Sequence, residues 1–240
     1  MRKKIHTIIT AAGYSEQQFL NSGFGVPKGL VLVNGRSVIS RAIDSYTVDP
    51  QALSVVLNEE ECERWALDKH VASAYPDASI TRVKSSARGA VASALLASSP
   101  IDPDLPLVIA AGDSEITTDI RPIISEYVDT EAAGGTVVFR ACGARWSYVG
   151  VDGGGRVTEV SEKYQIGNLA TIGLFYFQTG KLFLDASSWT LLNNAHVNGN
   201  FYISTTLNYL ISEGLDIQYR EINPRHYNPW SRPQDFKEPE

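Results

Sequence analysis

Residues 4–13 read Lys-Ile-His-Thr-Ile-Ile-Thr-Ala-Ala-Gly. The run is mainly apolar and β-branched and ends in small residues, which is typical of a buried strand that leads into a turn. A strand is therefore predicted at Lys4–Ala11. Because Ala12 and Gly13 carry little or no side chain, backbone amides after this strand can approach a phosphate or a base closely.

Outward from this strand, short β-rich runs alternate with longer helical patterns. This rhythm predicts an α/β fold, with a single-domain, Rossmann-like, mixed and mainly parallel sheet flanked by helices. No repeat or low-complexity linker divides the chain, so one domain is expected over residues 1–240. Further strands are predicted at Leu53–Leu57, Ser79–Lys84, Leu107–Ala111, Thr136–Arg140, Tyr148–Val151, Val157–Ser161, Leu169–Phe177 and Leu215–Ile222. Helices are predicted at Ser37–Tyr46, Glu59–Ala74, Ala90–Ala97, Lys181–Asn194 and Tyr202–Glu213, and the tail Pro224–Glu240 is expected on the surface.

The composition narrows the class of protein. Of 240 residues, 43% are hydrophobic and 20% are charged, and the formal net charge is −6. An acidic chain without a dense basic patch is not expected to bind nucleic acid. No run approaches the roughly 20 apolar residues of a membrane span. Two distant cysteines, Cys62 and Cys142, indicate a reducing compartment, so we expect a cytoplasmic protein; its oligomeric state stays open.

The segment after the first strand offers a phosphate counter-charge. A polar loop is predicted at Tyr14–Gly25, and Val26-Pro27-Lys28 follows it. The proline stiffens the backbone just before Lys28, so the ammonium group can be held near a fixed point. An ordinary strand and loop with a surface lysine is the alternative interpretation.

Asp113 stands just past the apolar run Leu107–Ala111. Open α/β sheets bind ligands at the carboxyl ends of their strands. A carboxylate at that place suits Mg²⁺, which also takes phosphate oxygens and waters. A turn residue or a helix N-cap is the alternative, since Ser114 and Thr117 are typical capping residues.

Glu162 and Lys163 follow the predicted strand Val157–Ser161. Adjacent side chains on an extended segment point to opposite faces, so the two can contact different groups. One can bind hydroxyl groups while the other binds a phosphate. A solvated charge pair is the alternative.

Several motifs together resemble the bacterial sugar-phosphate nucleotidyltransferases, and most closely the branch found in capsule and surface-polysaccharide loci. The family signature reads Ala-Gly-x-Gly-x-Arg-Phe, a short spacer, then Pro-Lys-Pro-Leu. The likeness extends from Ile5 to about Phe236. The matching stretches, in chain order, are Ile8-Ile9-Thr10-Ala11-Ala12-Gly13, Ser22-Gly23-Phe24-Gly25-Val26-Pro27-Lys28-Gly29-Leu30, Arg88-Gly89-Ala90, Gly112-Asp113-Ser114, Trp146-Ser147-Tyr148-Val149, Val157-Thr158-Glu159-Val160-Ser161-Glu162-Lys163, Ala170-Thr171-Ile172-Gly173-Leu174-Phe175-Tyr176-Phe177 and Val197-Asn198-Gly199-Asn200-Phe201-Tyr202.

The resemblance implies a GT-A-type fold and a role for each matched residue. A nucleotide-binding half of about residues 1–120 would use Ala11, Ala12, Gly13, Gln17, Gln18, Lys28, Gly89 and Asp113. Asp113 would also hold Mg²⁺. An acceptor-binding half of about residues 121–240 would use Tyr148, Glu162, Lys163 and Asn200. Lys28 and Lys163 would be the catalytic residues, on the α-phosphate and on the phosphate of the sugar or polyol acceptor. The reaction would release pyrophosphate from a nucleoside triphosphate.

The chain departs from the family at two places. Gln17 or Gln18 stands where the signature arginine steadies the leaving pyrophosphate, although the backbone amides of Tyr14–Gln18 offer an alternative anion-binding nest. The family's C-terminal motif, Gly-Thr-Pro-Glu-Asp, is reduced to Ser231-Arg232-Pro233-Gln234-Asp235, and Asn228 and Pro229 stand where a second metal ligand is expected. Two other functions therefore remain open. One is a glycosyltransferase of the same fold that uses a nucleotide-sugar, and the other is a catalytically silent nucleotide-binding homologue.

Overall fold

Strand β1 (His6–Ala11) lies inside the sheet, as its apolar sequence predicts. It pairs in parallel with β4 (Leu53–Asn58) on one side and with β6 (Leu107–Ala111) on the other. Ile8 and Ile9 are fully buried and belong to two different core clusters, because successive side chains on a strand point to opposite faces. This computed structural model describes residues 4–85 and 87–236.

The other strands complete one nine-stranded mixed sheet and two small ribbons. Within the sheet they are β5 (Ser79–Val83), β8 (Gly134–Arg140), β9 (Ser147–Val151), β10 (Val157–Glu162), β11 (Leu169–Phe177) and β12 (Ile217–Glu221). The ribbons are formed by β2 (Leu32–Val33) with β3 (Arg36–Ser37) and by β7 (Ser114–Ile116) with β13 (Tyr227–Pro229).

The sheet has the strand order β10, β9, β11, β6, β1, β4, β5, and β8 joins it by pairing with both β11 and β12. The part β6-β1-β4-β5 is parallel, as is the pair β8–β12. Strand β11 is antiparallel to β6, β8 and β9. The predicted single-domain α/β fold with a mixed sheet is confirmed.

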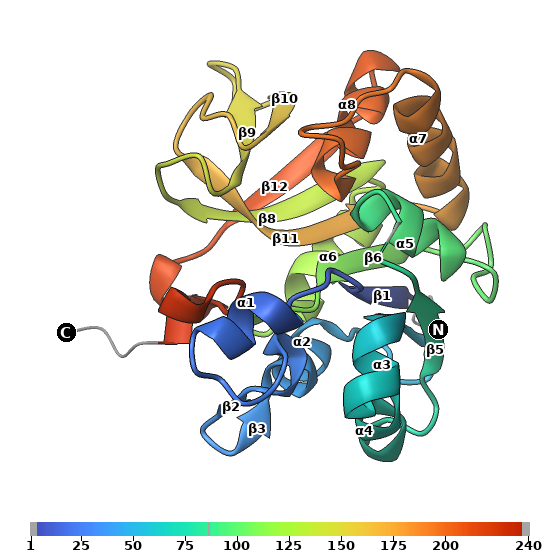
Figure 1. Cartoon of the computed structure of the whole chain (residues 1–240). Coiled ribbons are helices and arrows are strands. Elements are labelled where there is room, and N and C mark those ends of the chain that lie inside the picture. The colour runs from blue at the N-terminus through green and yellow to red at the C-terminus, as the bar shows by residue number, and fades with distance from the viewer. Residues whose placement is uncertain (1–3, 86, 237–240) are drawn as a thin grey trace.

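Helices cover both faces of the sheet. They are α1 (Glu16–Asn21), α2 (Val38–Tyr46), α3 (Glu59–Trp65), α4 (Leu67–Ala74), α5 (Ala90–Leu96), α6 (Arg121–Asp129), α7 (Gly180–Leu192) and α8 (Ile203–Ser212), with the 3-10 helices η1 (Lys28–Leu30), η2 (Pro224–His226) and η3 (Pro233–Phe236). Helices α2, α4 and α6 share one core cluster with Ile9, whereas α5, α7 and α8 share the other with Ile8. Figure 1 shows α7 and α8 above the sheet and α2, α3 and α4 below it.

One predicted helix is wrong as a single element. The pattern over Glu59–Ala74 forms α3 and α4, which are separated at Ala66. Ala66 has φ +54°, the left-handed conformation that ends a helix. Since this residue is an alanine and not a glycine or asparagine, the sequence carries no signal for the break.

Two helices were not predicted. The loop expected at Tyr14–Gly25 contains α1, which is anchored by the fully buried side chain of Phe19. Helix α6 begins with Arg121-Pro122, and proline is favoured in the first turn of a helix. Its buried residues Ile123, Ile124 and Tyr127 have helical spacing.

The tail expected on the surface also packs against the N-terminal half. Strand β13 pairs with β7, and Phe236 contacts Phe19, Phe24 and Trp230 with ring centroids 5.2–5.6 Å apart. Aromatic rings in such tilted and edge-on arrangements attract each other beyond their area of burial. Residues 224–236 nevertheless lie at the surface, as expected, with only Pro233 buried, and residues 237–240 lie outside the described part.

Two further observations concern helix length and the cysteines. Among the described residues, no helix has the length and apolar character needed to cross a membrane. Both cysteines are unpaired thiols, and burial raises the pKa of the Cys62 thiol to about 11. Cys62 is therefore protonated at neutral pH and is a poor nucleophile.

The left-handed Ala66 gives a test of the fold. We expect Ala66→Gly to raise the free energy of unfolding by about 1 kcal/mol, because glycine adopts positive φ without the Cβ clash. Ala72→Gly, at an exposed position within α4, should lower it by about 1 kcal/mol. Urea denaturation measures both, and a loss of stability in Ala66→Gly would contradict the left-handed break.

Candidate active site

The carboxyl ends of β1, β4 and β6 meet at one edge of the sheet. The Gly112 amide donates to the Thr10 carbonyl at 2.9 Å. Asn58, the last residue of β4, donates from Nδ2 to the Ala12 carbonyl at 3.2 Å. The turn after β6 and the start of α3 therefore both lie against the small-residue turn that follows β1, where ligands of open α/β sheets bind.

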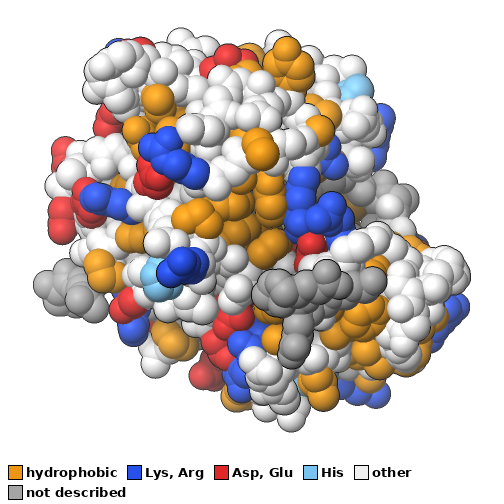
Figure 2. Space-filling view, turned by 90° about the vertical axis from the view of Figure 1, so that its left-hand side faces the viewer, with side chains coloured by type: hydrophobic (Ala, Val, Ile, Leu, Met, Phe, Trp, Pro, Cys, Tyr) orange, Lys and Arg blue, Asp and Glu red, His pale blue; other side chains and the backbone are white. Residues whose placement is uncertain are grey.

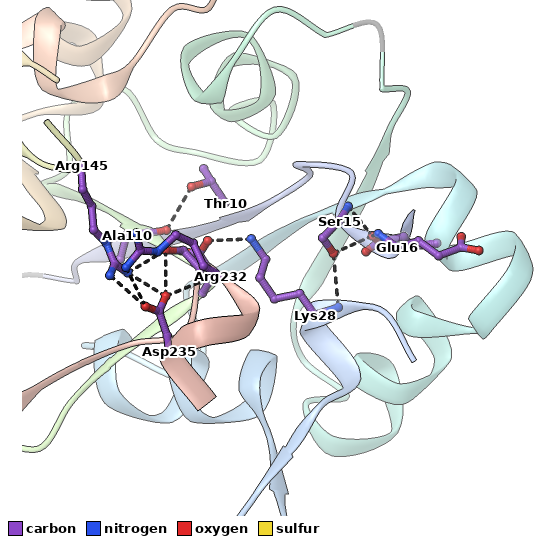
Figure 3. A network of polar contacts seen from close by, with 11 residues as sticks. Thr10, Ser15, Glu16, Lys28, Ala110, Arg145, Arg232 and Asp235 are labelled. Carbon is purple, nitrogen blue, oxygen red and sulfur yellow. Dashed lines mark hydrogen bonds and ion pairs between the residues drawn. The ribbon is translucent and has the colours of Figure 1, made fainter. Parts of the chain in front are cut away.

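Lys28 and Asp113 are in direct contact at this edge. The Lys28 Nζ lies 2.7 Å from Asp113 Oδ2, and the two side chains are 19% and 28% exposed. Figure 3 shows the Lys28 side chain extended away from Ser15. The sequence predicts both residues as site residues, but nothing in it predicts that they pair with each other.

A small cavity joins this ion pair to the turn after β1. It has a volume of about 90 Å³ and is lined by Gly13, Ser15, Lys28, Glu61 and Asp113, among others. Whole small-molecule ligands usually occupy about 300–1,000 Å³. The cavity can therefore take one small group, such as a phosphate, but not a whole ligand of ordinary size.

The charged groups around the cavity decide whether a metal fits. They are two carboxylates, Glu61 and Asp113, and one ammonium group, Lys28, so their formal sum is −1. Glu115 is already paired with Arg41 at 2.8 Å. In the described ranges, no three His, Cys, Asp or Glu side chains form a metal-binding group. Mg²⁺ can nevertheless be held by a single carboxylate together with waters and substrate phosphates, and Asp113 meets that minimum.

Gln17 and Gln18 lie on the exposed surface of α1. The Gln17 side chain donates to Asn21 Oδ1 at 2.8 Å, along the helix. The amides of Ser15 and Glu16, which belong to the expected anion-binding nest, both donate to Glu61 Oε1, at 2.8 and 3.1 Å. Two of the nest's donors are therefore already used by a carboxylate of the protein.

Glu162 and Lys163 lie in different surroundings, although Lys163 is not on the extended segment that the sequence predicts. Glu162 is 9% exposed, and its Oε2 accepts hydrogen bonds from the hydroxyls of Ser147 and Ser204. Lys163 has φ +61°, and its exposed ammonium lies 5.0 Å from the centre of the Tyr202 ring. That is a cation–π distance. The glutamate is thus held rigidly, while the lysine faces the space beside Tyr202.

Tyr148 and Asn200, also expected on the acceptor side, differ in exposure. Tyr148 is fully buried, and its hydroxyl donates to the Gly143 carbonyl at 2.7 Å, so it is part of the core under β9. Asn200 is exposed, and its main chain exchanges hydrogen bonds with Val197. Asn200 therefore remains accessible, whereas the Tyr148 side chain shows no exposed surface.

Gly89 brings two of the sequence motifs together. It has φ +94°, and a Cβ atom there would lie 2.4 Å from the Phe201 carbonyl oxygen. The Phe201 amide donates to the Arg88 carbonyl at 2.9 Å, and the Val91 amide donates to Phe201 at 3.1 Å. A glycine is thus required at position 89 because the Phe201 backbone, just before α8, packs directly against it. This structural requirement is independent of any contact with a nucleotide.

The tail contacts the backbone of Asp113 and binds Arg145, and the sequence does not predict either contact. The Trp230 amide donates to the Asp113 carbonyl at 2.8 Å. Arg145 binds both carboxylate oxygens of Asp235, at 2.8 and 2.7 Å (Figure 3). The Arg145 guanidinium also lies 4.2 Å from the centre of a Trp146 ring. Burial opposes ionisation of Asp235, but the hydrogen bonds from Arg145 and from the Arg232 amide outweigh it and lower the pKa of this carboxyl.

The face that carries the tail is hollowed. Figure 2 shows hydrophobic side chains in the hollow and a group of Lys and Arg side chains beside it. An apolar floor with a few charged groups at its margin is typical of small-molecule sites.

Comparisons with known proteins establish the fold. No family model and no curated protein matches the sequence. The nucleoside-diphosphate-sugar pyrophosphorylase from Vibrio cholerae RC9 superposes with a TM-score of 0.80 at 20% identity, over 95% of this chain and 97% of that chain. The inositol-1-phosphate CTP transferase from T. maritima gives 0.72 at 14% identity, over 98% and 94%. UDP-glucose pyrophosphorylase complexed with UDP-glucose gives 0.67 at 15% identity, over 90% of each chain. This chain therefore has the fold of these enzymes.

The Gly89 contact can be tested by adding one methyl group. We expect Gly89→Ala to lower the free energy of unfolding by about 1–3 kcal/mol, because the new Cβ meets the Phe201 backbone at a positive φ. Gly153→Ala, in a turn with open space around it, is the matched control and should change stability little. Denaturant unfolding of the two variants measures the difference. Equal stabilities would contradict both the close Phe201 contact and the positive φ of Gly89.

The lowered pKa of Asp235 predicts how tail packing depends on pH. A carboxyl with a depressed folded-state pKa adds stability above its unfolded value of about 3.9, and this stability is lost as pH falls through the folded value. At pH 7, Asp235→Asn should therefore lower the unfolding free energy by about 1–3 kcal/mol. The gap to wild type should narrow below pH 4. Asp104→Asn, at an exposed position, is the control; a constant gap from pH 7 to pH 3 would contradict the assignment.

Proposed function

We propose that this chain is a nucleotidyltransferase that joins a nucleoside triphosphate to a sugar 1-phosphate or a related phosphorylated polyol and releases pyrophosphate. The observation that carries the proposal is the Lys28–Asp113 pair in the cavity beside Gly13, at the carboxyl ends of β1 and β6. An ammonium group next to a carboxylate at this edge can meet a phosphate and a phosphate-bound cation together. The likeness in fold to nucleotidyltransferases supports the same assignment.

In this proposal the first half of the chain, to about residue 120, binds the nucleotide. Its turn Ala11–Gly13 approaches the nucleotide with backbone atoms, and Lys28 contacts the α-phosphate. Because the charged groups of the cavity sum to −1, a phosphate needs additional positive charge to enter. Mg²⁺ bound by Asp113 would supply this charge to the phosphate oxygens.

The second half binds the acceptor. Lys163, beside Tyr202, faces the acceptor phosphate, and Glu162 offers its second oxygen to sugar hydroxyls. An acceptor phosphate oxygen attacks the α-phosphorus in line. A new P–O bond forms as the bond to the bridging oxygen breaks, and pyrophosphate leaves with that electron pair. The protein contributes positioning and charge neutralisation, which are the main terms in phosphoryl transfer.

The resemblance in sequence also suggests where the product is used. We infer that the activated sugar or polyol serves surface-polysaccharide synthesis and that the chain works in the cytoplasm. Its two unpaired cysteines suit a reducing compartment.

One observation favours a glycosyltransferase as the second candidate. Gln17 and Gln18 are exposed on α1, and Glu61 uses two amides of the loop, so few donors remain near a leaving pyrophosphate. An enzyme that binds an intact nucleotide-sugar does not need to stabilise pyrophosphate as a leaving group. A silent nucleotide-binding homologue would bind either ligand without turnover.

The test combines a substrate panel with two lysine variants. Pyrophosphate release is measured with nucleoside triphosphates, Mg²⁺ and a panel of sugar and polyol phosphates, and the affinity for each ligand is measured by calorimetry. Lys28→Ala should weaken the nucleotide, and Lys163→Ala the acceptor, each by roughly tenfold or more, because a charge-assisted hydrogen bond contributes about 1.5–3 kcal/mol. Lys181→Ala, an exposed lysine on α7, is the control.

The outcomes separate the candidates. Opposite selectivity of the two variants supports the division into nucleotide and acceptor halves, whereas equal losses for both ligands would overturn it. Tight binding of an intact nucleotide-sugar without pyrophosphate release from any triphosphate would indicate the glycosyltransferase instead. Binding without any turnover would indicate the silent homologue.

A further inference from the structure

Glu61 is a buried carboxylate with an unusual set of partners. It lies in the first turn of α3, is 2% exposed, and forms no ion pair among the described residues. Its Oε1 accepts three hydrogen bonds, from the Ser15 amide at 2.8 Å, the Ser15 hydroxyl at 2.8 Å and the Glu16 amide at 3.1 Å. A buried carboxylate needs such donors, because desolvation without them is costly. All three donors come from Ser15 and Glu16, where the loop after β1 enters α1.

The Ser15 hydroxyl extends this contact to Lys28. It donates its proton to Glu61 and accepts a hydrogen bond from the Lys28 amide at 3.2 Å. Figure 3 shows Ser15 between Glu16 and the Lys28 backbone. Because Ser15 is 5% exposed, water does not readily replace either partner. A continuous relay therefore runs from α3 through Ser15 to the backbone of Lys28.

Lys28 is thus held at both ends. Its amide is fixed by the relay, and its ammonium lies on Asp113, at 2.7 Å. Its carbonyl accepts from the Val31 amide at 3.1 Å, which closes the 3-10 turn η1. The relay joins helix α3, which follows β4, and the loop after β1 to Lys28. The Lys28 ammonium in turn contacts Asp113, which follows β6. Shifting the Lys28 backbone would therefore move the ammonium relative to Asp113.

We propose that Glu61 is a positioning residue that sets the place of the Lys28 ammonium through Ser15. The proposal rests on the proposed function, in which Lys28 contacts the α-phosphate. The Ser15 and Glu16 amides already donate to Glu61, so they are not free to bind a phosphate. Phosphate binding therefore depends more strongly on Lys28. A misplacement of about 1 Å in a reacting group can reduce a rate by roughly a hundredfold.

The first experiment measures the relay without any ligand. Amide hydrogen exchange is followed by NMR in the full chain for wild type, Glu61→Gln and Ser15→Ala. Glu61→Gln weakens the acceptor that holds the Ser15 hydroxyl, and Ser15→Ala removes that hydroxyl. In both variants the exchange rate of the Lys28 amide should rise at least tenfold. Amides of β4 and β6 report on global stability and should be unchanged. Glu63→Gln, exposed on the same helix, is the matched control.

The second experiment is a double-mutant cycle with Lys28→Ala, using nucleotide turnover as the readout. If Glu61 acts through Lys28, Glu61→Gln should lower kcat at least tenfold with little change in the KM of the acceptor. In the Lys28→Ala background the same change should have no further effect, since coupled residues are not additive. A purely structural role would give losses that add in the two backgrounds, and that result would overturn the proposal.

The two readouts keep the hypotheses apart. If no nucleotide binds, the proposed function fails, while the exchange rate of the Lys28 amide still tests the relay. Unchanged Lys28 exchange in both Glu61→Gln and Ser15→Ala would overturn the positioning role even in an active enzyme. Ser15→Ala covers the case in which Glu61→Gln does not fold, because it removes one oxygen and leaves both loop amides on Glu61.

Discussion

The parallel pairing of β1 with both β4 and β6 is the constraint on which the candidate site depends. Three strands that run in the same direction bring their carboxyl ends to one edge, and the chain therefore places Gly13, Asn58 and Asp113 together. Lys28 reaches the same edge because Pro27 and the Ser15 hydroxyl fix its backbone. A sheet with another strand order would leave the same residues far apart. The proposed chemistry therefore depends first on the strand order, which brings these side chains together.

Much of this fold could be predicted, because its strongest signals are local. Strand β6 has the predicted bounds, and α2 begins one residue after the predicted start, with Ser37 as its N-cap. Signals that depend on distant contacts were missed. Helix α1 is short and polar, and it is stabilised by Phe19 packing on Phe24 and Phe236. The break at Ala66 depends on one left-handed residue with no sequence signature.

The residues of the candidate site could likewise be predicted only in part. Lys28, Asp113, Glu162 and Lys163 could be picked out because each follows a strand or a stiff turn, although their roles remain proposals. Glu61 could not, because it is one of three consecutive glutamates, Glu59–Glu61, and only the phase of α3 and the path of the loop after β1 decide which is buried. Arg145 was likewise missed, since its partner Asp235 lies 90 residues away. Sequence spacing cannot report a contact between segments whose relative positions are set by the sheet.

The tail is synthesised last, and three of its residues contact the region around the candidate site. Trp230 donates to the backbone of Asp113, Asp235 holds Arg145, and Phe236 covers Phe19. On a ribosome, all the strands of the sheet emerge before these residues do. A nascent chain can therefore form its sheet while the Asp113 carbonyl and the Arg145 guanidinium still lack their partners. Long-range contacts of this kind form late because closing a large loop is slow. The growing polypeptide would complete the surroundings of the candidate site only after residue 236 has left the exit tunnel, so the sheet would form before the candidate site is complete.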